Sequence, residues 1–269
     1  MRKYDLVCFD MDGTLTRLRS SWCWIHQCFD VDNGPAYQAF IDGEIDEPEF
    51  MRRDIALWLG KKPDLTVDEI AVLFRDMPLI GGIQETIACL SANGIRSVIV
   101  SGGIDRAAAM IAREFGFDGY VADELCSNPD GTLTGEGRMN VDLQDKGINV
   151  RRYIDEFGTT RERTVSIGNS YTDIGMFRES GLSIAFNPTD QMTQDAADHT
   201  VFSDNIADVL DYILIDDRPE DDGPNERGMR PRMRRRLGSL DREPGIESCN
   251  SELYRGLDCS QIGRMPRDS

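Results

Sequence analysis

The sequence predicts an α/β fold: a doubly wound, mostly parallel sheet with a small helical domain inserted after the first strand. Two patterns lead to this prediction. From residue 78 onward, short apolar runs alternate with segments of helical patterning, as in successive βαβ units. Residues 17–77 instead carry large apolar side chains at helical spacing only. The 269 residues, 40% of them hydrophobic, suffice for one large domain or two small ones.

The first strand is expected at residues 4–9, an apolar run that stops at Asp10. The inserted segment at 17–77 is predicted to be all helical, because its apolar residues recur three or four positions apart between glycine and proline breaks. The remaining parts, 1–16 and 78–217, are assigned to the core that contains the sheet.

Within the core, strand-like and helix-like segments follow one another in strict order. Asn-Gly and Pro-Asp-Gly sequences provide turn signals between several of them. We expect helices at 83–90, 104–115, 147–157, 174–179 and 206–215, strands at 95–100, 119–122, 164–167 and 182–186, and a hairpin at 125–133.

The chain carries a net charge of −18, from 48 acidic and 30 basic residues. This balance argues against nucleic acid or an anionic membrane as the main partner, because both attract clustered positive charge. The acidic excess lies within residues 1–217, whereas residues 218–269 are rich in Arg and poor in large apolar side chains. We expect this last segment to be a disordered tail.

The type of charge also carries information. Asp outnumbers Glu, and Lys is rare beside Arg; such an acidic, Lys-poor composition resembles that of haloarchaeal proteins, although GC-rich codon usage would also favour Arg. Seven cysteines without a CxxC motif and only two histidines argue against a zinc site. No apolar stretch approaches the length of a membrane span. We therefore expect a soluble, cytoplasmic protein, and its oligomeric state stays open.

Polar residues gather where the predicted strands end or helices begin, and ligands of open parallel sheets bind at the carboxyl ends of strands. They are Asp10 and Asp12 after the first strand, Ser101 and Gly102 after the strand at 95–100, Lys146 near a helix start, and Asn169 and Asp173 after the strand at 164–167. Two carboxylates two positions apart, Asp10 and Asp12, suit a nucleophile and a proton donor. The side-chain oxygens of Asn169 and Asp173 suit Mg²⁺ as ligands. Taken singly, each group is also explained by helix capping or by an ordinary surface position.

Taken together, these residues resemble the haloacid dehalogenase (HAD) superfamily of phosphohydrolases. The DMDGTLT sequence at 10–16 is its most diagnostic motif. PLIGG at 78–82, DGTLTG at 130–135 and a helical insert between the first two motifs resemble its phosphoserine phosphatase branch. The resemblance covers about residues 4–215 and implies a Rossmann-like core, with the helical insert at 17–77 as a cap that closes over the substrate.

The resemblance also implies a reaction: Mg²⁺-dependent hydrolysis of a small phosphorylated metabolite through an aspartyl-phosphate. Asp10 would be the nucleophile, and Asp12 would transfer the proton. Ser101, the Gly102 N–H and Lys146 would bind the phosphoryl oxygens. The metal would be held by Asp10, Asp12, Asn169 and Asp173.

Two features depart from the pattern of the family. Asn169 stands where the metal loop usually begins with Asp, so a metal would be held by one charge fewer. No acidic residue follows the first motif until Asp30, whereas phosphoserine enzymes carry a Glu there for the substrate amine. The substrate stays open between phosphoserine and another small metabolite, such as a sugar or hydroxy-acid phosphate. A non-catalytic protein that binds phosphorylated ligands is a further alternative.

Two arginines of the predicted cap, Arg52 and Arg53, are candidates for binding a substrate carboxylate, because a guanidinium pairs with a carboxylate through two hydrogen bonds. The alternative is that both are solvated residues on the surface of a helix.

Overall fold

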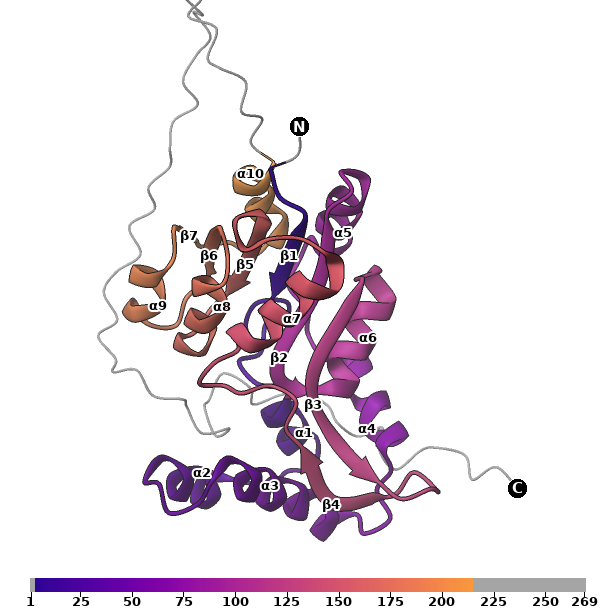
Figure 1. Ribbon diagram of the computed structural model, residues 1–269. Coiled ribbons are helices and arrows are strands. Elements are labelled where there is room, and N and C mark those ends of the chain that lie inside the picture. Colours follow the sequence, from indigo (N-terminus) through magenta and orange to yellow (C-terminus); the bar gives the residue numbers. More distant parts are fainter. Residues whose placement is uncertain (1–2, 215–269) are drawn as a thin grey trace, which may run out of the picture.

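The computed structural model describes residues 3–214, so the tail predicted at 218–269 lies outside the described part. Seven strands form one sheet in the order β4-β3-β2-β1-β5-β6-β7, and only the β3–β4 pair is antiparallel (Figure 1). The strands are β1 Leu6–Phe9, β2 Arg96–Ile104, β3 Gly119–Ser127, β4 Leu133–Arg138, β5 Thr164–Gly168, β6 Leu182–Phe186 and β7 His199–Val201. The predicted mostly parallel sheet is confirmed.

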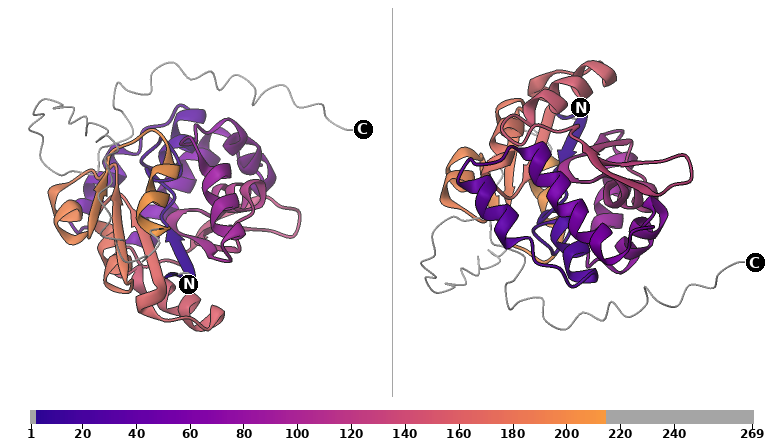
Figure 2. Two further views of the ribbon diagram at one scale, coloured as in Figure 1. Left: turned by 90° about the horizontal axis from the view of Figure 1, so that it is seen from above. Right: turned by 90° about the horizontal axis from the view of Figure 1, so that it is seen from below.

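Helices cover both faces of this sheet, because alternate side chains of each central strand point to opposite sides. On one face, Val7 and Phe9 belong to a core with residues of α5 (Ile83–Ala92) and α6 (Asp105–Phe115). On the other face, Leu6 and Cys8 pack in a smaller core with residues of α7 (Gly147–Phe157) and α8 (Ile174–Arg178). The two views of Figure 2 show these layers from both ends of the strands.

The chain between β1 and α5 is helical, as expected for residues 17–77. It forms α1 (Ser21–Cys28), α2 (Gly34–Ile41), α3 (Glu47–Lys61), α4 (Val67–Leu73) and the short 3-10 helix η1 (Phe74–Asp76). Three of these helices begin at side chains that accept a backbone N–H: Ser20, Asp46 and Thr66. Figure 1 shows α1, α2 and α3 beyond the end of β1 to which its arrow points, with α3 packed against β4. The division into a core and a cap with boundaries at 17 and 77 stays a prediction.

A buried polar contact joins two helices of this insert. The indole N–H of Trp58 in α3 donates to Nδ1 of His26 in α1 at 2.8 Å, and Nε2 of the same imidazole lies 3.2 Å from Oδ2 of Asp54. All three side chains are buried. Because Nδ1 accepts a hydrogen bond, the proton of a neutral His26 sits on Nε2, facing the carboxylate. His26 therefore has the structural role that a buried, fully enclosed imidazole suggests.

The structure differs from the predicted elements in several places. The hairpin predicted at 125–133 is the pair β3 and β4, whose strands run from 119 to 127 and from 133 to 138. β2 runs on to Ile104 instead of ending at residue 100, with a shift of register against β3. A short helix, α9 (Gln191–Ala196), and the edge strand β7 were not predicted. The helix expected at 206–215 is a 3-10 turn, η4 (Ile206–Val209), followed by the short α10 (Leu210–Ile213). None of the described helices is long and apolar enough to cross a membrane.

Candidate active site

The first motif forms a tight turn directly after β1. The N–H of Asp10 donates to the carbonyl of Ile167 in β5 at 2.8 Å, which extends the sheet by one residue. The chain then folds back so that several following N–H groups reach the carbonyl of Met11. Gly13 lies at φ +82°, and a Cβ there would be 2.1 Å from Nδ2 of Asn169. Only glycine therefore allows the first motif and the Asn169 loop to approach this closely.

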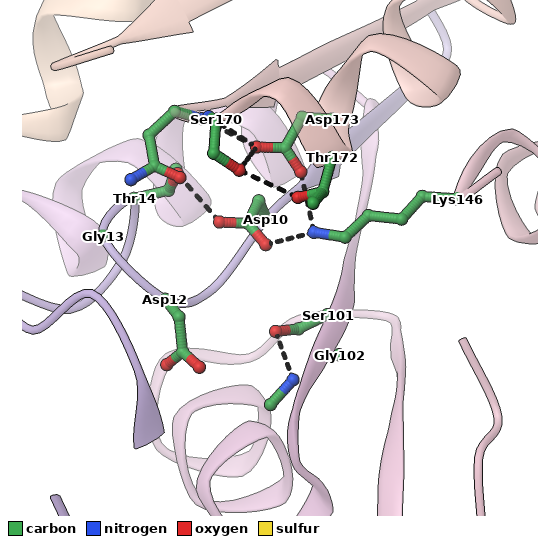
Figure 3. A network of polar contacts seen from close by, with 12 residues as sticks. Asp10, Asp12, Gly13, Thr14, Ser101, Gly102, Lys146, Ser170, Thr172 and Asp173 are labelled. Carbon is green, nitrogen blue, oxygen red and sulfur yellow. Dashed lines mark hydrogen bonds and ion pairs between the residues drawn. The ribbon is translucent and has the colours of Figure 1, made fainter. Parts of the chain in front are cut away.

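Lys146 joins two of the predicted carboxylates. Its Nζ donates to Oδ1 of Asp10 at 2.8 Å and to Oδ1 of Asp173 at 2.7 Å (Figure 3). All three residues are at least 97% buried. The second oxygen of Asp10 accepts a hydrogen bond from the hydroxyl of Thr14 at 3.2 Å. Lys146 lies directly before α7, so the start of this helix places a cation against the end of β1.

Burial and charge perturb the ionisation of this cluster. Burial, followed by the charge of Asp173, raises the pKa of Asp10 to about 7 against the opposing effect of Lys146. Burial also raises the pKa of Asp12 to about 6, while hydrogen bonds from Ser21 oppose the change. For Lys146, burial lowers the pKa, but the charges of Asp10 and Asp173 outweigh it and raise the pKa above its usual value. The ammonium therefore stays charged and both motif carboxylates exchange protons near neutrality.

The loop after β5 orients Asp173. Its Oδ2 accepts the N–H groups of Asn169 and Ser170 at 2.8 and 3.0 Å, which turns Oδ1 toward Lys146. A Cβ on Gly168 would come within 2.5 Å of the Asp173 carboxyl, so the glycine allows this close approach. The GNxxxD spacing thus serves to aim one carboxylate at the end of β1.

Ser101 and Gly102 lie beside Asp12 but not in the setting that was predicted. They were expected after a strand that ends at residue 100, but they belong to β2, and α6 begins only at Asp105. The hydroxyl of Ser101 accepts the N–H of Gly103 at 3.0 Å. A Cβ on Gly103 would lie 2.6 Å from Oδ2 of Asp12. β2 continues because its pairing with β3 resumes at Ile104.

One contact of Asp12 was missed in the sequence. Oδ2 of Asp12 accepts both the N–H and the hydroxyl of Ser21, each at 2.9 Å. Ser21 is the first residue of α1 and is fully buried. The pair Ser20-Ser21 before an apolar helix signals an N-cap, and Ser20 fulfils that role. Nothing in the sequence distinguishes Ser21 from a second capping residue.

Arg52 and Arg53 face a carboxylate of their own helix. Arg52 lies 2.8 Å from Glu49 and 3.6 Å from Glu136 of β4, and Arg53 lies 3.0 Å from Glu49. Within residues 3–214, neither guanidinium bonds to the residues around Asp10. Their binding of a substrate carboxylate stays a prediction.

The site fits a hard cation by charge and by donor type. The ammonium of Lys146 contacts Asp10 and Asp173, and Asp12 lies near enough to feel its charge, so three negative charges are balanced by one positive charge when all are ionised. A divalent cation would balance the remaining charge, and carboxylate and amide oxygens are the ligands that Mg²⁺ prefers. Among the described residues, no three His, Cys, Asp or Glu side chains converge on one point. Such a cation would therefore also need an amide oxygen, as Asn169 offers, and a backbone carbonyl.

Comparison with known families agrees with this geometry. A family model described as haloacid dehalogenase-like hydrolase matches residues 7–178. The chain belongs to this family. The match runs from within β1 to the end of α8 and therefore includes Asp10, Asp12, Lys146 and Asp173.

The similar proteins carry one recurring name. A phosphoserine phosphatase from Idiomarina loihiensis is 29% identical over 211 residues, which cover 76% of this chain and 91% of that protein. Phosphoserine phosphatase SerB2 from Mycobacterium tuberculosis is 36% identical over 152 residues, which cover 56% of this chain and 36% of that protein. A substrate-bound phosphoserine phosphatase structure superimposes with a TM-score of 0.67 at 26% identity, over 79% of this chain and all of that one.

Proposed function

We propose that this protein is a phosphatase that hydrolyses a small phosphomonoester in two steps, with Asp10 as the nucleophile. The observation that carries the proposal is the buried Asp10 carboxylate, which Lys146 and Thr14 hold at the end of β1 beside a second carboxylate. An orientation fixed from both oxygens suits in-line attack, because positioning contributes much of the rate in such reactions. The membership of a hydrolase family supports the same reaction.

In the first step, a carboxylate oxygen of Asp10 forms a bond to phosphorus, and the bond between phosphorus and the alcohol oxygen breaks. The departing alkoxide takes a proton from Asp12, so that a neutral alcohol leaves. In the second step, Asp12 accepts a proton from water as the water oxygen attacks phosphorus. This step releases phosphate and restores the Asp10 carboxylate. A pKa of about 6 for Asp12 suits both directions of transfer near neutral pH.

The transferring phosphoryl group carries negative charge that must be balanced. Lys146 is positioned to do so, because its Nζ lies within hydrogen-bond distance of the Asp10 oxygen. Ser101 and the N–H of Gly102 lie on the Asp12 side of the site and are assigned to the same phosphoryl oxygens. Trp22 supports this segment, because its indole N–H donates to the carbonyl of Gly102 at 3.2 Å.

We further propose Mg²⁺ as the cofactor, held by Asp10, the backbone carbonyl of Asp12, Asn169 and Asp173. When bound, it supplies positive charge that offsets the repulsion between the nucleophile and the phosphate. The excess of buried carboxylates over ammonium groups supports this assignment. Asn169 lies 5% exposed beside Gly13, where it brings an oxygen but no charge to the group.

The substrate is assigned by two observations that point in different directions. The names of the similar proteins favour phosphoserine. The absence of an acidic residue between Gly13 and Asp30 favours a substrate without an amine in that position. We therefore assign the class as small phosphomonoesters, with phosphoserine as the first compound to test and a sugar or hydroxy-acid phosphate as the second.

A panel of small phosphomonoesters tests the proposal. Release of phosphate is measured with Mg²⁺, and again after the metal is removed with a chelator. We expect turnover by the wild-type protein with Mg²⁺ and none by Asp10→Asn, which keeps the shape of the side chain but removes the nucleophile. Full turnover by Asp10→Asn would rule out the proposed nucleophile. Binding of phosphate or vanadate without turnover of any ester would instead indicate a non-catalytic binding protein.

A further inference from the structure

The first turn of α1 lies directly against the Asp12 carboxylate. Both the N–H and the hydroxyl of Ser21 donate to Oδ2 of Asp12, each at 2.9 Å. Ser21 is fully buried, so water does not compete for these hydrogen bonds. An ionised acceptor with two converging donors is held more firmly than a carboxylate with a single partner.

The same hydroxyl also contacts β2. Oγ of Ser21 accepts the N–H of Ile104 at 3.0 Å. A hydroxyl has one proton, and because it accepts from Ile104, that proton is directed at Asp12. Only glycine fits at position 103, since a Cβ there would lie 2.5 Å from Oγ of Ser21 and 2.6 Å from Oδ2 of Asp12. Ser21 therefore links the Asp12 turn to the segment that contains Ser101.

The two oxygens of Asp12 have different surroundings. Oδ2 is occupied by Ser21, whereas Oδ1 is buried without a hydrogen-bond partner. A buried carboxylate oxygen without a partner is costly unless another group uses it. A leaving alkoxide or an incoming water molecule would provide such a partner.

From this arrangement we propose that Ser21 is a positioning residue for the reaction: it holds Oδ2 of Asp12 so that Oδ1 faces the oxygen that receives the proton. The inference rests on the proposed function, in which Asp12 protonates the leaving alcohol. Ser21 does not itself touch the reacting atoms. Its loss leaves the backbone N–H contact with Oδ2 but frees the carboxylate to rotate.

The neighbouring serine provides a matched control. Oγ of Ser20 accepts the N–H of Cys23 at 3.3 Å and thereby caps α1. Its hydroxyl makes no hydrogen bond to Asp12. Ser20→Ala therefore weakens the same helix without touching the carboxylate. Ser21→Ala removes one hydrogen bond to Oδ2, and Ser21→Thr keeps the hydroxyl.

The test compares two substrates that differ in their need for a proton. An alkyl phosphomonoester releases a basic alkoxide, whereas p-nitrophenyl phosphate releases a stable anion that leaves without protonation. The measured quantity is kcat/KM, which covers the steps up to departure of the alcohol, so hydrolysis of the aspartyl-phosphate does not enter. Urea unfolding of each variant establishes that it is folded under the assay conditions.

For Ser21→Ala we expect kcat/KM to fall about tenfold or more on the alkyl ester and less than about threefold on p-nitrophenyl phosphate, since positioned proton transfer contributes about 10²–10⁴-fold. Ser20→Ala should leave the ratio between the two substrates unchanged, and Ser21→Thr should restore it in part. A parallel loss on both substrates, or no loss, would overturn the role of Ser21 while the phosphatase function stands. If the wild-type protein hydrolyses neither ester, the proposed function fails and the role of Ser21 fails with it.

Discussion

Lys146 is the residue whose replacement tests the electrostatics of the site most sharply. Lys146→Met keeps an unbranched apolar stem of similar length and removes the ammonium between Asp10 and Asp173. Both contacts are short, at 2.8 and 2.7 Å, and the side chain is 3% exposed. Breaking a buried ion pair by removing one partner costs about 3–5 kcal/mol, because the other charge is left uncompensated. We expect a loss of that size in the free energy of unfolding near pH 8 without divalent cations.

The same chain offers an exposed control with similar chemistry. Lys62 also contacts two carboxylates, Asp64 at 3.1 Å and Glu69 at 3.3 Å, but its side chain is 28% exposed and that of Asp64 is 81% exposed. Ion pairs in contact with water contribute less than about 1 kcal/mol. Lys62→Met should therefore cost much less than Lys146→Met in the same urea unfolding experiment.

The cost of Lys146→Met should also depend on pH, with a sign that follows from Asp10. The pKa of Asp10 already lies above its ordinary value, at about 7, and Lys146 acts to lower it. Without the ammonium, the pKa of Asp10 in the folded variant lies further above its value in the unfolded chain. The folded variant then binds a proton at pH values where the unfolded chain has lost it, so the free energy of unfolding falls as pH rises. The difference from wild type should be larger near pH 8 than near pH 5. A cost equal to that of Lys62→Met, or one that shrinks as pH rises, would refute the reasoning.

Three further predictions concern single residues. Asp123 is buried, and burial raises its pKa to about 6. Asp123→Asn keeps an oxygen acceptor for the N–H groups of Asn140 and Val141 and removes the buried charge. In urea unfolding it should stabilise the protein by up to about 2 kcal/mol above pH 7, where Asp123 is ionised, with no gain near pH 4. Gly13→Ala should destabilise the fold by at least about 1–2 kcal/mol, because φ is +82° and the methyl group would meet Asn169; an unchanged unfolding midpoint would contradict the geometry of the turn. Asn169→Asp should lower the Mg²⁺ concentration for half-maximal turnover by about tenfold, because ligand charge raises affinity; a higher requirement would exclude Asn169 as a ligand.

The central fold was predictable because its signals are local. Apolar runs of strand length that alternate with amphipathic helices specify parallel βαβ units, and the first strand ends where Asp10 interrupts an apolar run. Because carboxyl ends of neighbouring parallel strands meet, residues as distant in sequence as Asp10 and Asp173 could be placed at one edge of the sheet. The structure brings them to the same ammonium, that of Lys146.

Other features were not predictable because they depend on packing between segments. β2 continues through two glycines that are typical of a turn, since its pairing with β3 resumes at Ile104. β7 has three residues and α9 has six, too few to show a periodic pattern. The contact of Ser21 with Asp12 depends on how α1 folds back over the first motif, and the sequence spacing of nine residues carries no sign of it.

The central claim is that the Asp10 carboxylate becomes phosphorylated during turnover. A reaction quenched in acid during steady-state hydrolysis and reduced with borohydride converts an aspartyl-phosphate into homoserine, which mass spectrometry of the peptides containing residues 10–12 and residue 173 locates to one position. We predict homoserine at residue 10, and none in Asp10→Asn or without substrate. Homoserine at residue 12 or 173, or none during sustained turnover, would contradict the account.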